Sequence, residues 1–249
     1  MKRLIIHTLA LLFTALSAIA HPSFEEGNKY YAEGKYSDAI KAYEQVYEDG
    51  YQSADLYYNL GNAYTKLKQT GKAILYYEKA LKLEPGHEDA RNNLEWISAQ
   101  TRDRIEVIPT LFYQRWIQSF TSLFQPAGWA WITLLFEWLA AGGFSLYLLM
   151  KNRRIARNLF YLSCMLVTFT IIAWVAGSGR LHQINRSDSG VIMSSSAVVR
   201  AAPNGTGSEL FILHEGAVCD VLEQDQDWMK VRLTNGKEGW VEAEAMEMI

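Results

Sequence analysis

Asparagine side chains recur at a fixed interval in the first part of the chain. Asn28 and Asn62 are 34 residues apart, and so are Asn59 and Asn93. A carboxamide offers both a hydrogen-bond donor and an acceptor, so it can satisfy the polar groups of a bound peptide or of neighbouring helices. The spacing indicates repeated polar positions, and it leaves these two uses open.

Residues that commonly perform catalysis do not form a recognisable constellation. The five histidines are scattered, and no pair has the spacing of metal ligands; they are His7, His21, His87, His182 and His214. The sequence holds no His-Glu-x-x-His, Gly-x-Ser-x-Gly, phosphate-loop or dinucleotide-binding signature. Cys164 and Cys219 are too far apart to form a Cys-x-x-Cys redox pair. We therefore expect a protein that is not an enzyme and holds no metal or cofactor.

Composition narrows the class of partner. The chain has 249 residues, of which 49% are hydrophobic and 13% aromatic, too many for a disordered protein. Its formal net charge of -3 provides no basic excess to neutralise a phosphate backbone. We expect protein or peptide ligands and no nucleic acid.

The helices that must position the asparagines form an internal repeat. Sliding the chain by 34 residues aligns seven positions, among them Gly27 with Gly61 and Tyr43 with Tyr77. Such a period is typical of paired helices that stack on their neighbours. Gly61 lets the two helices of a unit approach closely, and Pro85 stands where the second helix should end.

These residues resemble the tetratricopeptide repeat family. One full repeat of the family is matched by Tyr57, Leu60, Gly61, Tyr64, Ala73, Tyr77, Ala80 and Pro85. The likeness covers two repeats over residues 24–85, and a third first helix from Glu88 is expected to cap the stack and face solvent. The fold expected for this part is an all-α solenoid.

The resemblance implies peptide or protein binding in a concave groove lined by the first helices, where asparagines hold the ligand's backbone. Basic residues that would clamp a terminal carboxylate are missing, since Phe24 and Tyr58 occupy the place of one of them. We expect an extended segment as ligand, although the asparagines could serve only to tie helices together. The candidate protein-binding residues are Asn28, Tyr58, Asn59, Asn62, Lys66 and Asn93.

The start of the chain predicts export. Lys2 and Arg3 precede an apolar run that ends in Ala18-Ile19-Ala20, the pattern of a signal peptide cleaved before His21. A retained anchor is the alternative. Either one exports the repeats.

Two apolar stretches predict a membrane hairpin. Residues 128–150 and 158–178 are each long enough to span a bilayer, and residues 151–157 between them carry four positive charges. The positive-inside rule assigns this loop to the cytoplasm. We therefore expect the hairpin to lie in a bacterial inner membrane, with both flanking soluble parts on the periplasmic side.

Three residues of the first span are candidates for a membrane helix contact. Glu137 falls near mid-depth, where a carboxyl is costly unless protonated or paired, and Thr168 and Thr170 could accept its hydrogen bond. Gly142 and Gly143 belong to a small-residue surface that another helix can approach. A proton relay is not expected, because no second acid, base or histidine accompanies Glu137.

An aromatic-rich amphipathic segment precedes the first span, at residues 106–127. We expect it to lie in the membrane interface. Packing against the last repeat helix is the alternative.

The last residues predict five short strands separated by turns, from Ala197 to Val241. Their order, with Val199-Arg200, Glu215-Gly216, Trp228 and Gly239-Trp240-Val241, resembles bacterial SH3 domains. Ala201-Ala202 departs from the family at the first loop. The resemblance implies protein or cell-wall peptide binding. Trp240 follows a glycine between strand neighbours and is expected in the core, whereas Trp228 is the candidate for an exposed ligand contact, with a place at the edge of the core as the alternative.

The order of these parts resembles the BatE-like members of the Bacteroides aerotolerance (Bat) group. The resemblance implies an inner-membrane scaffold that works with other Bat-type membrane proteins under oxidative or envelope stress; a peptidoglycan sensor is the alternative. The expected architecture is a signal peptide at 1–20, tetratricopeptide repeats with a capping helix at 21–105, the juxtamembrane segment at 106–127, transmembrane helices at 128–150 and 158–178 joined by a cytoplasmic loop at 151–157, a linker at 179–193 and an all-β SH3-like barrel at 194–249.

Overall fold

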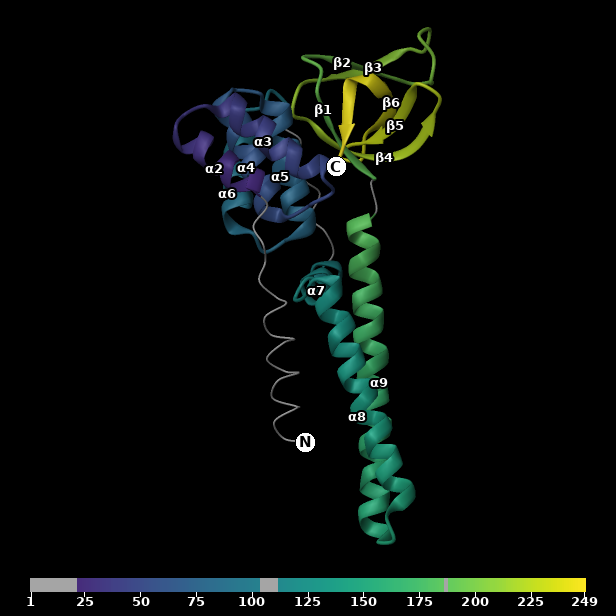
Figure 1. Ribbon diagram of the computed structural model, residues 1–249. Coiled ribbons are helices and arrows are strands. Elements are labelled where there is room, and N and C mark those ends of the chain that lie inside the picture. Colours follow the sequence, from purple (N-terminus) through teal and green to yellow (C-terminus); the bar gives the residue numbers. More distant parts are fainter. Residues whose placement is uncertain (1–21, 104–111, 186–187) are drawn as a thin grey trace.

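The computed structural model describes residues 22–103, 112–185 and 188–249. A stack of short helices and an antiparallel sheet lie side by side at one end of a long helical hairpin (Figure 1). The expected fold class, with a helical repeat, two apolar helices and an SH3-like sheet, is confirmed. The signal peptide predicted at 1–20 lies outside the described residues.

The repeat region consists of α2 (Pro22–Ala32), α3 (Tyr36–Glu48), α4 (Ala54–Lys66), α5 (Thr70–Leu83) and α6 (Glu88–Ser98). Each unit closes because a tyrosine ring lies on a glycine. A Cβ atom on Gly27 would lie 2.4 Å from the Tyr43 ring, and one on Gly61 would lie 2.6 Å from the Tyr77 ring. Any larger residue would separate the paired helices, so the 34-residue pattern records a packing requirement.

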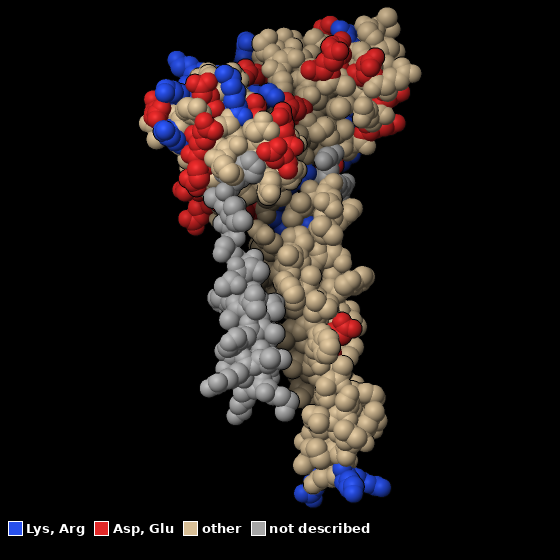
Figure 2. Space-filling view, in the orientation of Figure 1, with Lys and Arg blue, Asp and Glu red and all other residues tan. Residues whose placement is uncertain are grey.

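The hairpin consists of α8 (Pro126–Leu149) and α9 (Arg153–Asn185), preceded by α7 (Phe112–Thr121). Both α8 and α9 are long and apolar enough to cross a membrane, and most of their large apolar side chains are exposed. Figure 2 shows this surface as largely uncharged, with a basic cluster at the far tip.

The helical boundaries in the hairpin differ from those expected from the sequence. Helix α9 already begins at Arg153, inside the loop predicted at 151–157, and it continues to Asn185, into the linker predicted at 179–193. Charged residues can extend a membrane-spanning helix beyond its apolar stretch, since its backbone bonds do not depend on hydrophobicity.

Helix α7 packs at the start of the hairpin. The Trp129 indole nitrogen donates a hydrogen bond to the main-chain oxygen of Thr121 at 2.9 Å, and the Phe120 and Phe124 rings lie 5.3 Å from the Trp129 ring. The main neighbour of α7 is α9 rather than α6. Of the predicted segment 106–127, residues 106–111 lie outside the described ranges.

The sheet has seven strands rather than the five expected. They are β1 (Ser189–Ile192), β2 (Ala197–Arg200), β3 (Glu209–Leu213), β4 (Val218–Asp225), β5 (Trp228–Arg232), β6 (Glu238–Glu242) and β7 (Met246–Met248), in the order β3-β2-β6-β5-β4-β1-β7. The sequence prediction missed β1 and β7, which are short and pair with each other. Because β1 also pairs with β4, the sheet begins at Ser189 and not at 194.

Strand β1 also joins the sheet to the repeat helices. Val191 is fully buried in the apolar core of the repeats, whereas its neighbour Ile192 is fully buried in the core of the sheet. Alternate residues of a strand face opposite sides, so one short strand serves two cores. The two soluble parts are therefore packed together directly, where a linker at 179–193 was expected.

Candidate functional site

The asparagines form two equivalent hydrogen-bonded clusters. Asn28 Oδ1 accepts hydrogen bonds from the Tyr43 hydroxyl at 2.8 Å and from Asn59 Nδ2 at 3.1 Å. Asn62 Oδ1 accepts bonds from the Tyr77 hydroxyl at 2.7 Å and from Asn93 Nδ2 at 2.8 Å. These bonds tie α2 to α4 and α4 to α6, so the asparagines have the structural use that the sequence left open.

Burial keeps the tyrosine hydroxyls of these clusters in their protonated, hydrogen-bond-donating form. It raises the pKa of both Tyr43 and Tyr77 to about 12, so both hydroxyls stay protonated at neutral pH. Both rings are almost fully buried.

Half of each amide remains unused within the described chain. Asn28 and Asn62 make no hydrogen bond there through Nδ2, nor do Asn59 and Asn93 through Oδ1. All four side chains are half-buried on the first helices. These four asparagines, which we call the asparagine ladder, therefore still have donors and acceptors suited to a peptide backbone.

Tyr58 and Lys66 differ in their surroundings. The Tyr58 ring lies 4.9 Å from the His87 ring and 6.2 Å from the Tyr77 ring, so it packs between α5 and the turn before α6. His87 in turn caps α6, because its Nδ1 accepts the N–H of Ala90 at 3.2 Å. Lys66 is exposed in the last turn of α4.

The outer face of the sheet carries two tryptophans. Along β6, Gly239 and Val241 are buried while Trp240 is half-buried, so the prediction that Trp240 is a core residue is wrong. Trp240 pairs with Lys230 across the strands, and half-buried Trp228 pairs with Glu242. Strand alternation puts both indoles on one face. Applied to residues 238–242, the same alternation in the sequence could have revealed this face.

The three residues predicted to form a membrane helix contact differ in what surrounds them. Glu137 is exposed on α8, and no side chain in the described ranges forms a hydrogen bond with it. The two threonines expected to partner it, Thr168 and Thr170, instead donate to main-chain oxygens of their own helix. A Cβ on Gly143 would lie 2.8 Å from the Ser163 hydroxyl, whereas one on Gly142 would meet nothing within 4 Å. Gly143 thus serves packing within the hairpin.

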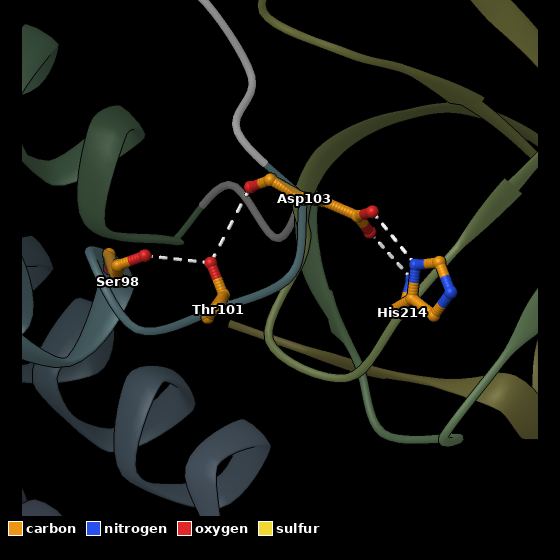
Figure 3. A network of polar contacts seen from close by, with 4 residues as sticks. All are labelled: Ser98, Thr101, Asp103 and His214. Atoms are coloured by element: carbon orange, nitrogen blue, oxygen red, sulfur yellow. Dashed lines mark hydrogen bonds and ion pairs between the residues drawn. The ribbon is translucent and has the colours of Figure 1, made fainter.

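A junction that the sequence prediction missed joins the repeats, the sheet and α9. Asp103 accepts the main-chain N–H of His214 at 2.6 Å and lies 2.8 Å from its Nδ1, as Figure 3 shows. Glu215 accepts the N–H of Gly71 at 2.8 Å, at the N-terminal end of α5. These carboxylates satisfy main-chain donors that the sequence alone cannot pair.

A cavity of about 470 Å³ lies at this junction between α5, the end of α9 and the sheet. Its charged lining residues are Glu78, Lys82, Arg91, Arg180 and Asp188. Burial raises the pKa of the Glu78 carboxyl to about 7.

Comparisons with known proteins agree with this division of the chain. A family model described as tetratricopeptide repeat matches residues 54–87, a second described as TPR repeat matches residues 27–68, and one described as bacterial SH3 domain matches residues 194–247. No curated protein matches the chain. The SH3 match begins after β1, which is consistent with this strand's second task of packing on the repeats.

Proposed function

We propose that this protein is a membrane-anchored adaptor whose repeat groove binds a segment of another envelope protein. The observation that supports this most directly is the ladder of half-used amides on α2, α4 and α6. The sheet leaves this ladder alone, since its polar contacts involve α5 and the segment after α6. Tetratricopeptide repeats in general bind protein partners, and bacterial SH3 domains in general are binding modules as well.

The hairpin supports a membrane location. Exposed apolar side chains cover most of α8 and α9, a surface that water disfavours and hydrocarbon accepts. Four positive charges gather at the tip, on Lys151, Arg153, Arg154 and Arg157. By the positive-inside rule, the tip is cytoplasmic and both soluble parts are periplasmic, in the inner membrane of a bacterium.

We further propose that the adaptor belongs to an aerotolerance complex of the Bat type. The order of export signal, repeats, hairpin and SH3-like domain supports this, and other Bat-type membrane proteins are then the expected partners. Binding at two surfaces of one rigid unit raises the effective concentration of each ligand near the other.

Photo-crosslinking from Lys66 tests the groove. A diazirine lysine analogue at this exposed position should capture one protein in intact membranes. The double variant Asn28→Asp/Asn62→Asp keeps the oxygen that Tyr43 and Tyr77 use but replaces the unused NH₂ with an acceptor, so capture should fall at least tenfold.

The matched control places the same analogue at Lys41, an exposed residue of the second helix α3. Equal capture from Lys41, or capture from Lys66 that the double variant leaves unchanged, would contradict the groove assignment.

A cell-wall sensor is the second candidate, and the tryptophan face favours it. Trp228 and Trp240 lie on one outward face, together with Lys230 of β5 opposite Trp240, and such a face suits a sugar or peptide ligand. The full chain in detergent should bind purified sacculi if this is correct, and Trp240→Ala should weaken that binding. Binding that Trp240→Ala leaves unchanged would rule out this face.

A further inference from the structure

A groove between α8 and α9 opens beside Glu137. It has a volume of about 630 Å³, and its lining includes Glu137, Ala140 and Ala141 from α8 and Ser163, Cys164 and Thr170 from α9. Apart from the Glu137 carboxyl, two hydroxyls and the Cys164 thiol, the side chains of the wall are apolar.

The carboxyl lies at the depth where a membrane tolerates it least. Glu137 stands in the middle of the 24-residue helix α8, about 17 Å from either end at a rise of about 1.5 Å per residue. Hydrocarbon offers no donor there, so the carboxyl needs a hydrogen-bonding partner whether it is ionised or neutral.

The hairpin itself does not supply that partner. The Ser163 hydroxyl donates to the main-chain oxygen of Leu159 at 2.8 Å, and the Thr170 hydroxyl donates to that of Leu166 at 3.0 Å. Each hydroxyl has a single proton, which these bonds already use. Within the described residues, neither hydroxyl is therefore left to donate to the Glu137 carboxyl, and no side chain forms a hydrogen bond with it.

We propose that this groove holds one transmembrane helix of a different membrane protein, whose amide, hydroxyl or amine side chain at mid-depth donates a hydrogen bond to Glu137. Ala140 and Ala141 allow the backbone of that helix to approach closely. A second copy of this chain fits less well, because it brings another carboxyl to the same depth. Lipid chains lack a donor altogether. The proposal rests on the membrane location proposed above.

The native thiol of Cys164 provides the test, since it is exposed and lines the groove while Cys219 is buried. A maleimide-benzophenone reagent is attached to the full chain in native membranes and activated by light. We expect one protein adduct of a partner with a polar residue in the middle of a span. Glu137→Gln, which keeps an acceptor, should retain most of the adduct, and Glu137→Leu should lower it at least tenfold.

A reciprocal change identifies the bond. Replacing the partner's mid-span polar residue with leucine should lower the adduct as much as Glu137→Leu does, and the two changes together should lower it no further. Ser145→Leu is the matched control, because it removes a polar side chain of α8 whose hydroxyl donates to Ala141 and which does not line the groove.

Three outcomes would overturn the proposal. They are an adduct of two differently tagged copies of this chain, an adduct that Glu137→Leu leaves unchanged, and labelling of Cys164 without any protein adduct. Accessibility of Cys164 to a membrane-impermeant maleimide tests the membrane location separately. Ready labelling by that reagent would contradict the proposed anchoring as well, whereas protection with no adduct would contradict the groove alone.

Discussion

Arg180 Nη2 donates a hydrogen bond to the main-chain oxygen of Leu83 at 2.9 Å, joining the end of α9 to the end of α5. The same nitrogen donates to the oxygen of Lys82 at 2.9 Å, and the arginine is only 4% exposed. The final carbonyls of a helix lack partners within it, and a cation there also meets the negative end of the helix dipole. The hairpin is thus fastened to the repeats by an ionic cap.

Arg180→Met should release this fastening. The two carbonyls would lose their donor in a buried place, at a cost of about 1–3 kcal/mol. We expect faster hydrogen exchange at the end of α5, with little change in α2 and α3. Arg157→Met, at the exposed tip of the hairpin, is the control. Equal exchange in the two variants would contradict the capping role.

The asparagine ladder should respond differently to two substitutions at one position. Asn62→Leu removes the acceptor for Tyr77 and Asn93, so the free energy of unfolding of the repeats should fall by about 1–3 kcal/mol. Asn62→Asp keeps that acceptor and should lose less. Denaturant-dependent hydrogen exchange of α4 to α6 measures both. A larger loss for the aspartate would show that the tie is not what stabilises the helices.

Substitutions at two glycines with the same backbone conformation distinguish the effect of backbone strain from the effect of docking between the sheet and the repeats. Gly216 has φ +88°, and a Cβ there would lie 2.8 Å from Ile74 Cδ1 and 2.9 Å from Thr101 Cγ2. Gly236 has φ +84° and would meet nothing within 4 Å. Alanine at either position incurs about 1–2 kcal/mol of strain, but only Gly216→Ala should push the sheet off the repeats.

The Glu215 carboxylate accepts a hydrogen bond from the Gly71 N–H, so hydrogen exchange of this amide reports the docking of the sheet. It should accelerate in Gly216→Ala and stay slow in Gly236→Ala. Acceleration in both variants would mean that strain within the sheet, and not contact with α5, controls the junction.

Glu78 predicts a pH dependence of stability. Its folded-state pKa, about 7, is raised by burial above the ordinary value of 4.5, so the folded state binds the proton more tightly than the unfolded state. Stability should therefore fall as pH rises from about 5 to 7. The other charged groups that line its cavity are Lys82, Arg91, Arg180 and Asp188.

Thermal unfolding at pH 5 and pH 8 measures the effect. Glu78→Gln should make the melting temperature less dependent on pH, and the exposed Glu84→Gln should leave the dependence of the parent protein intact. If Glu78→Gln and the parent protein show the same pH dependence, Glu78 is not its source.

The sequence predicted those parts of the fold that repeat or alternate locally. Gly61 and Tyr77 were recognisable as repeat positions because the same residue types occur 34 residues earlier, but their mutual contact emerges only in the structure. Two other contacts have no repeated counterpart in the sequence: the contact of Arg180 with Leu83, and that of Asp103 with His214. The residues of each pair meet only after distant elements of the chain have packed. No local pattern marks them. Trp240 follows a glycine, which is typical of a buried position, but strand alternation puts it on the face opposite to buried Gly239 and Val241.

Helix α9 has 33 residues without interruption and is therefore about 50 Å long. Arg180 fastens the upper end of this helix to α5, and α5 packs on β1. Movement of that end therefore moves the repeat groove and the tryptophan face together. A change of about 5° in the tilt of α9 would sweep that end sideways by about 4 Å, and tilt follows the thickness of the surrounding bilayer. A thicker or thinner membrane would thus reposition both proposed binding surfaces together, without any ligand.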